Sequence, residues 1–187
     1  MTETRKTIIL LAVLMSLLTL AACGDPTQGH LKAGNNFTSA GQFAEAVEEY
    51  EAALELDPDN VDVMTNLGVA YYQLGQPTMA IDMYNKAIEI APEDADIRSN
   101  LAASYVQQYE PEGTTEPLEM ALEQYQKAVE LDPDLPEAHY GLGVVYMLLG
   151  QTEDAIASFE KFQELDKGTD PQATENAQAI LEQLRGQ

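Results

Sequence analysis

The order of apolar and polar positions between residues 61 and 94 predicts two helices joined by a turn. Apolar or small residues recur at steps of three and four in both halves of this stretch, at Leu67, Ala70 and Tyr71 and then at Ala80, Tyr84 and Ala87. Such steps place side chains on one face of a helix. Gly75 lies between the two series and Pro92 follows the second, and both residue types interrupt helices. We therefore predict a helix–turn–helix unit that ends near Pro92.

The same unit recurs along the chain with a period of 34 residues. Positions of matching residue type at this interval are Gly34 and Gly68, Ala46 and Ala80, Ala121 and Ala155, and Pro58 and Pro92. Near the middle of the chain the interval grows to 41, from Pro92 to Pro133, so one insertion of seven residues explains the exception. A unit this short cannot bury its apolar face alone, and successive units must therefore stack.

These columns of equivalent positions resemble the tetratricopeptide repeat family, whose signature is Leu-Gly-x-x-Tyr, then Ala-x-x-x-Phe, then Pro, in a 34-residue period. The resemblance extends from about residue 27 to residue 170. It implies an all-α fold, a right-handed α-solenoid of four helix pairs plus a C-terminal capping helix. The expected segments are repeat one at 27–60, repeat two at 61–94, repeat three at 95–135, repeat four at 136–169 and the capping helix at 170–187.

Two of the repeats depart from the pattern. Repeat three carries the insertion, at 108–117, and its Pro and Gly content predicts a loop. This loop is either part of a binding face, as insertions in solenoids often are, or a tolerated surface loop. In repeat four, Phe162 replaces the usual Ala and Lys167 the usual Pro, so we expect a different structure to follow it. The apolar face of the last segment is typical of a helix that closes a solenoid.

The N-terminus has the features of an export signal. Arg5 and Lys6 precede the apolar run 8–22, which ends in small residues. The alternative is a membrane-spanning helix, but a span needs about 20 apolar residues and this run is shorter. The residues Leu-Ala-Ala-Cys that end at Cys23 resemble a bacterial lipobox. In that family the cysteine becomes the first mature residue and carries the lipid.

This resemblance implies a signal peptide at 1–22, and a lipidated Cys23 with a short linker at 23–26. Two or more acyl chains anchor a protein stably where one is marginal. The expected location is outside the cytoplasm, on the periplasmic or cell-surface face of a bacterial membrane. Cys23 is the only cysteine, so no disulfide can form within the chain.

The charge of the chain excludes several classes of partner. The sequence has nine Lys and Arg against 32 Asp and Glu, a net charge of −23. Without residues 1–22 the charge is −24, because Arg5, Lys6 and Glu3 are lost. Phosphates and anionic lipid heads are repelled by such a surface, so we expect no nucleic-acid binding. The lipid, and not the protein surface, would be the membrane anchor.

No arrangement of residues predicts catalysis. The two histidines, His30 and His139, share one repeat column, which favours packing over metal binding. Serines lack a G-x-S-x-G setting, and there is no Gly-rich phosphate loop or Cys/His cluster. We therefore expect no enzymatic activity, no cofactor, no metal and no small-molecule substrate.

The family resemblance also implies where a partner would bind. In tetratricopeptide proteins the first helix of each pair lines the concave surface, where ligands usually lie. Carried over by column, this predicted groove consists of Asn35, Thr65, Asn66, Val69, Tyr72, Gln73, Ser99, Asn100, Ala103, Val106, Gln107, Tyr140, Val144 and Met147. Family members that grip an acidic C-terminal carboxylate use Lys and Arg in the groove, and here both are lacking. Ligands of that class are therefore not expected.

The predicted groove grades from polar to apolar toward the C-terminus. Asn66 and Asn100 share one column, and each amide both donates and accepts hydrogen bonds. They could hold the main chain of an extended peptide while Tyr140, Val144 and Met147 receive an apolar side chain. The alternative is that the C-terminal helix covers this apolar end and leaves no pocket.

The sequence thus predicts a lipid-anchored adaptor that docks another protein or peptide at a membrane surface. Its likeness to lipoproteins of this kind implies a place in envelope, pilus or secretion assembly, which is an argument by analogy because a fold does not fix a function. The alternative is a constitutive structural subunit of a multiprotein or homo-oligomeric envelope complex. An enzyme is the remaining alternative, and no motif favours it.

Overall fold

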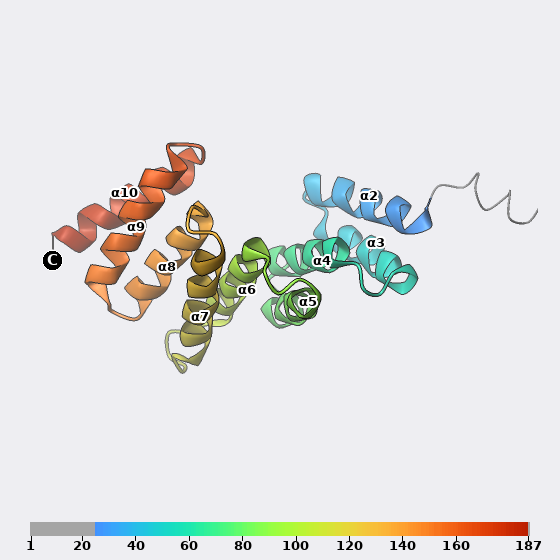
Figure 1. Cartoon of the computed structure of the whole chain (residues 1–187), viewed down its shortest axis with the longest axis horizontal. Helices are drawn as coiled ribbons and strands as arrows, with labels where there is room; N and C mark the ends of the chain where they lie inside the picture. The colour runs from blue at the N-terminus through green and yellow to red at the C-terminus, as the bar shows by residue number, and fades with distance from the viewer. Residues whose placement is uncertain (1–24, 187) are drawn as a thin grey trace, which may run out of the picture. The chain divides into compact units, whose positions relative to one another are not determined.

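A computed structural model describes residues 25–186, and in this range the regular structure is all helical (Figure 1), which confirms the predicted all-α fold. The helices are α2 (Pro26–Ser39), α3 (Phe43–Leu56), α4 (Val61–Gln73), α5 (Pro77–Ile90), α6 (Ala95–Gln108), α7 (Glu116–Leu131), α8 (Pro136–Leu148), α9 (Thr152–Asp166) and α10 (Pro171–Arg185). None of these described helices is long and apolar enough to cross a membrane. The predicted signal peptide and the lipidation site at Cys23 lie outside the described residues.

The chain divides into two compact units with a boundary after Pro58. In the first unit, α2 packs against α3. The two helices approach closely because Gly34 lies against the ring of Tyr50, and a Cβ at position 34 would overlap that ring. The Tyr50 hydroxyl donates to Asn35 Oδ1 at 2.7 Å and lies 3.0 Å from Thr38 Oγ1. Tyr50 is therefore both the core and the polar link of this pair.

The second unit contains three further pairs, α4 with α5, α6 with α7 and α8 with α9, and then α10. Each helix packs against the next one in the chain, and α6 also contacts α4 and α8. Glycine again allows close approach, since a Cβ at Gly68 would lie 2.7 Å from Tyr84 Cε1 and one at Gly143 would lie 2.8 Å from the Phe159 ring. Because α6 contacts both α4 and α8, the first helices of the three pairs form a continuous row.

Glycine also closes the turns within the regular pairs. Gly75 has a φ of 70°, in the left-handed region that favours glycine. The N–H of the next residue, Gln76, then donates to Tyr71 O at 2.9 Å and satisfies one carbonyl at the end of α4. Gly41 and Gly150 take the same conformation. Between α6 and α7 there is no such turn, and residues 109–115 form a longer loop before Pro117 in the first turn of α7.

The last helix, α10, packs against α9. Its buried Ala177, Leu181 and Leu184 form one apolar cluster with Ala155, Phe159 and Phe162 of α9. The Asp170 side chain accepts from the N–H groups of Gln172 and Ala173, which caps the start of α10. Phe162, one of the two departures of repeat four, is therefore a core contact of this helix.

The connection between α9 and α10 is organised by Asp166, which is 5% exposed. Its side chain accepts from the Thr174 hydroxyl at 2.6 Å and from the N–H groups of Gly168 and Asp170 at 3.0 Å each. These hydrogen bonds, that of Thr174 first, favour the ionised form and lower the pKa of Asp166. Lys167, the other departure of repeat four, follows with a left-handed φ of 50°.

Candidate binding groove

Three helices of the second unit carry most of the predicted groove. They are α4, α6 and α8, the first helices of their pairs, and α6 contacts both of the others. Within this row, side chains from all three helices surround a cavity of about 370 Å³. We call it the tyrosine cavity, and its lining residues are Tyr72, Ala103, Val106, Gln107, Tyr125, Tyr140, Gly141 and Val144. Six of these eight belong to the predicted groove, and Tyr125 and Gly141 do not.

Tyr125 enters the cavity wall because it packs differently from its equivalents. Tyr84 of α5 lies against Gly68 of its own pair. In the α6–α7 pair the corresponding glycine position is Ala102, which is fully buried, and the Tyr125 ring lies instead against Gly141 of the following helix α8. A Cβ at Gly141 would overlap the end of this ring. The tyrosine of one pair therefore bridges to the next pair.

The sequence did contain a signal for this arrangement. Position 141 belongs to the column of Asn66 and Asn100, but holds Gly. Position 102 belongs to the column of Gly68, but holds Ala. The two departures fall on the two sides of Tyr125, and together they exchange a close contact within one pair for a close contact between pairs.

The other predicted residues are placed differently. Asn66, Val69 and Thr65 lie half-buried on α4, and Gln73 is exposed at its end. Asn100 is half-buried on α6. Ser99 is 8% exposed, so little of this predicted groove residue is accessible on α6. Asn35 lies on α2 in the first unit, where it accepts the hydrogen bond of Tyr50.

The apolar end of the predicted groove is shared between the cavity and the last helices. Met147 packs against the α9–α10 cluster and does not line the tyrosine cavity. Tyr140 does both, since its ring meets Phe159 and Phe162 edge to face with centroids 5.6 and 5.1 Å apart. Met147 and Tyr140, at the apolar end of the predicted groove, therefore pack against α9 and α10, and the tyrosine cavity remains beside them.

The tyrosine cavity is electrically neutral. Among the described residues, those that line it include no Lys, Arg, Asp or Glu. Burial raises the pKa of the Tyr125 hydroxyl, and the nearby Tyr72 raises it further. Gln107 Nε2 donates to the backbone oxygen of Tyr72 at 3.2 Å, a contact that ties α6 to α4 at the edge of the cavity. The cavity thus offers uncharged hydrogen-bonding groups in apolar surroundings.

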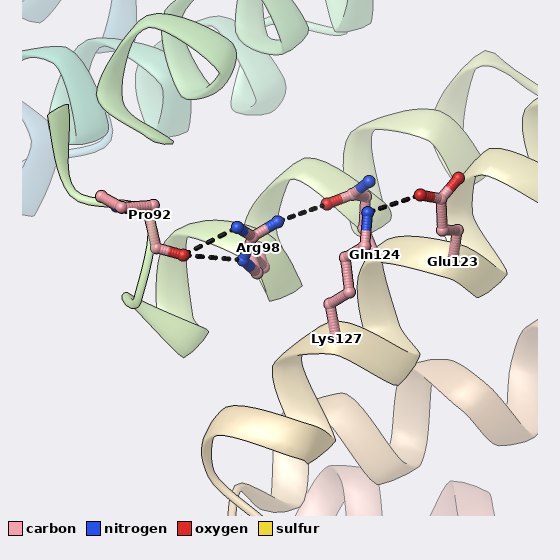
Figure 2. Close-up of polar contacts among 5 residues, drawn as sticks. All are labelled: Pro92, Arg98, Glu123, Gln124 and Lys127. Carbon is pink, nitrogen blue, oxygen red and sulfur yellow. Dashed lines mark hydrogen bonds and ion pairs between the residues drawn. The ribbon is translucent and has the colours of Figure 1, made fainter. Parts of the chain in front are cut away.

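Two of the few cations of the chain lie elsewhere and already have partners. Arg98 Nη2 and Nε donate to Pro92 O at 2.7 and 3.1 Å, and its Nη1 donates to Gln124 Oε1 at 3.1 Å (Figure 2). Lys127 pairs with Glu123 on the same helix (Figure 2). Arg98 therefore links the turn before α6 to α7, and these positive charges serve the fold at a place distinct from the tyrosine cavity.

The described residues offer no alternative chemistry at this site. No group of three or more His, Cys, Asp or Glu in residues 25–186 could hold a metal ion. His30 Nδ1 lies 2.7 Å from Glu49 Oε2, and His139 Nε2 lies 2.9 Å from Pro133 O, so both histidines make contacts within the fold. What the tyrosine cavity can do is bind an apolar group by burial and a polar group by hydrogen bonding.

Comparison with known proteins agrees with the helix pairs. A family profile described as TPR repeat matches residues 34–75 and 118–150. Two profiles described as tetratricopeptide repeat match residues 61–94 and 136–169. No curated protein matches the chain significantly in sequence.

Solved structures show the same fold. MamA 41-end from Desulfovibrio magneticus is 26% identical, with a TM-score of 0.68 and 78% of each chain covered. The thermophilic TPR protein TTC0263 from Thermus thermophilus is 24% identical, with a TM-score of 0.71, and 84% of this chain and 80% of that one are covered. The first TPR of Spaghetti (RPAP3), bound to the HSP90 peptide SRMEEVD, is 24% identical with a TM-score of 0.61 over 66% of this chain and 93% of that one.

Proposed function

We propose that this chain, which belongs to the tetratricopeptide repeat family, is a non-catalytic adaptor that binds an extended segment of another protein along α4, α6 and α8. The observation that carries the proposal is the tyrosine cavity, because six predicted groove residues from three helices meet around it. Its volume of about 370 Å³ lies in the range of roughly 300–1,000 Å³ that is usual for ligand pockets.

A segment in extended conformation suits a row of three first helices in which α6 contacts both α4 and α8. Asn66 on α4 and Asn100 on α6 share one repeat column, and the amide of each side chain can both donate hydrogen bonds to and accept them from the main chain of the segment. The tyrosine cavity then receives one side chain. The main-chain contacts supply affinity for an extended backbone, and the cavity supplies selectivity for a residue.

The charge of the chain decides against one class of peptide. The RPAP3 neighbour binds a peptide that ends in Glu-Glu-Val-Asp. This chain has a net charge of −23, and the predicted groove contains no Lys or Arg to receive carboxylates. We therefore expect its partner segment to be neutral or basic, and the peptide SRMEEVD not to bind.

We further propose that Cys23 carries the lipid and holds the protein at the surface of a bacterial membrane, in the assembly of envelope, pilus or secretion structures. Only Gly24 and Asp25 separate Cys23 from the start of α2 at Pro26. At about 3.4 Å per residue this link spans at most about 10 Å, so α2 would stay close to the lipid. Tethering raises the local concentration of the adaptor around partners in the same membrane.

The adaptor role is tested by cross-linking in cells that make the protein, followed by mass spectrometry. Ala103→Leu narrows the tyrosine cavity without touching a fully buried position, since Ala103 is only half-buried. We expect it to reduce partner recovery about tenfold, whereas the matched control Ala44→Leu, on an exposed position of α3, leaves recovery unchanged. Equal recovery from all three proteins would contradict the binding site.

The anchor is tested separately. Cys23→Ser removes the acylated sulfur and should move the protein from the membrane fraction to the soluble one, with the circular dichroism of the helices unchanged. A protein that stays on the membrane after this change is not held by a lipid at Cys23.

A further inference from the structure

Tyr50 and Tyr125 occupy equivalent positions on the second helices of their pairs, but the surroundings of their hydroxyls differ. In the first unit, the Tyr50 hydroxyl is bonded by Asn35 and Thr38 of its own pair. Tyr125 is the equivalent residue on α7, and the positions equivalent to Asn35 and Thr38 hold Ala103 and Val106. Neither of these side chains can form a hydrogen bond.

No other group replaces those partners. Tyr125 is 5% exposed, and no hydrogen bond joins its hydroxyl to the other residues in the range 25–186. The hydroxyl oxygen is nonetheless not fully buried, because Thr65 Oγ1 is the fully buried side-chain oxygen that lacks a partner in this range. The hydroxyl end of the ring lies against Gly141, and both residues line the tyrosine cavity. A hydroxyl that opens onto a cavity bonds to water there, so a guest that displaces this water must replace its hydrogen bond to be favoured.

Two further polar groups border the same space. Tyr72 lines the tyrosine cavity together with Tyr125. Gln107 uses its Nε2 to donate to Tyr72 O, which leaves its amide oxygen as an acceptor. The remaining walls are apolar or aromatic, with Val144 and Tyr140 on α8.

We propose that the tyrosine cavity takes a tyrosine side chain of the partner, whose hydroxyl oxygen accepts a hydrogen bond from the Tyr125 hydroxyl. This inference rests on the proposed groove and specifies the residue that it selects. The aromatic ring of the guest is buried among Val106, Val144 and Tyr140, and its own O–H can donate to the amide oxygen of Gln107.

Other guests fit the cavity less well. A carboxylate would be buried without a cation, in a chain of net charge −23. An ammonium or guanidinium would be buried without a carboxylate, since none lines the cavity among the described residues. A phenylalanine or leucine fills the space but leaves the hydroxyl of Tyr125 without a partner. A phenol both accepts and donates, which matches the groups present.

The test uses small side-chain analogues and so does not depend on knowing the partner. The chain from residue 23 on, with Cys23→Ser, is titrated with p-cresol and with toluene, and binding is followed by the amide NMR shifts of Gly141 and Val144. One hydrogen bond predicts that p-cresol binds about fivefold more tightly than toluene. In Tyr125→Phe, which removes a hydroxyl without a protein partner, the two affinities should agree within about twofold.

Tyr50→Phe is the matched control, because it removes the hydroxyl of the equivalent tyrosine in the first unit and should keep the preference for p-cresol. The proposal is overturned if toluene binds as tightly as p-cresol, if the preference survives in Tyr125→Phe, or if neither compound shifts these amides. It is also overturned if n-butylammonium or propionate binds more tightly than p-cresol.

The adaptor hypothesis can fail separately. If p-cresol binds as expected but cross-linking captures no partner through the groove, the selectivity of the cavity stands and the proposed function does not. If a partner is captured whose bound segment places a residue other than tyrosine in the cavity, the function stands and the further inference is wrong.

Discussion

Two of the glycines that lie against tyrosine rings, Gly68 and Gly141, should respond differently to the same substitution. At either Gly68 or Gly141, alanine adds a Cβ that overlaps a ring, of Tyr84 or of Tyr125. Both glycines are in the middle of a helix, where alanine alone would stabilise by about 1 kcal/mol. The difference lies in where each ring can go.

At Gly68 the tyrosine ring has no cavity to move into when the Cβ is added. The added Cβ would lie 2.7 Å from Tyr84 Cε1, and Tyr84 is 1% exposed and lines none of the cavities described above. Overpacking of this kind costs about 1–3 kcal/mol. Against the gain of about 1 kcal/mol in helix propensity, Gly68→Ala should lower the free energy of unfolding by up to about 2 kcal/mol.

At Gly141 the Tyr125 ring can turn into the open tyrosine cavity, which has about 370 Å³. We therefore expect Gly141→Ala to change the free energy of unfolding by less than about 1 kcal/mol. The displaced ring then occupies the site of the guest, so the affinity for p-cresol should fall at least about fivefold.

Urea unfolding followed by circular dichroism gives both free energies, and the NMR titration gives the affinity. The two variants are matched, because each adds one methyl group at a helix glycine under a tyrosine of the same column. Equal destabilisation by both, or p-cresol binding that is unchanged in Gly141→Ala, would show that Tyr125 does not move into the cavity and would refute this reasoning.

Three further predictions concern stability. Tyr50→Phe removes the hydroxyl shared by Asn35 and Thr38 and should lower the free energy of unfolding by about 1 kcal/mol in urea, and no loss would mean that these contacts are not maintained in solution. Leu181→Ala, at a fully buried position in the α9–α10 cluster, should cost about 2–5 kcal/mol and increase hydrogen exchange in α10 first; uniform exchange along the chain would contradict a terminal cap. The pKa of Asp166 is lowered below its ordinary value of 3.8, so its hydrogen bonds stabilise the fold above that pH and are lost as the pH falls through the lowered pKa. Wild type should thus be more stable than Asp166→Asn at pH 7, and thermal unfolding should show this advantage shrinking below about pH 4.

Much of the fold could be predicted because it depends on local sequence and on one repeated interval. Apolar spacing gives the helices, Gly75 and its equivalents give the turns, and the 34-residue period gives the pairing. Six residues of the tyrosine cavity follow from the same columns, since equivalent positions on stacked helices face the same way. Their role in peptide binding stays a prediction.

The remaining features depend on contacts between neighbouring pairs, which columns do not describe. The repeat column predicts that Tyr125 packs against α6, the first helix of its own pair. The direction of its ring is instead set jointly by Ala102 on α6 and Gly141 on α8. The column places Ser99 in the predicted groove, and the packing of α6 leaves only 8% of it exposed. Met147 turns to the α9–α10 cluster because Phe162 and the last helix provide an apolar surface there.

The ring of Tyr140 has a consequence for communication along the chain. It forms part of the cavity wall on one side and touches Phe159 and Phe162 on the other. A guest that restrains this ring would also restrain the aromatic pair on which the final helix rests, and by thermodynamic reciprocity an ordered final helix would then strengthen binding of the guest to the same degree. Occupancy of the tyrosine cavity would then appear as slower amide hydrogen exchange in α10, a helix that the guest does not contact.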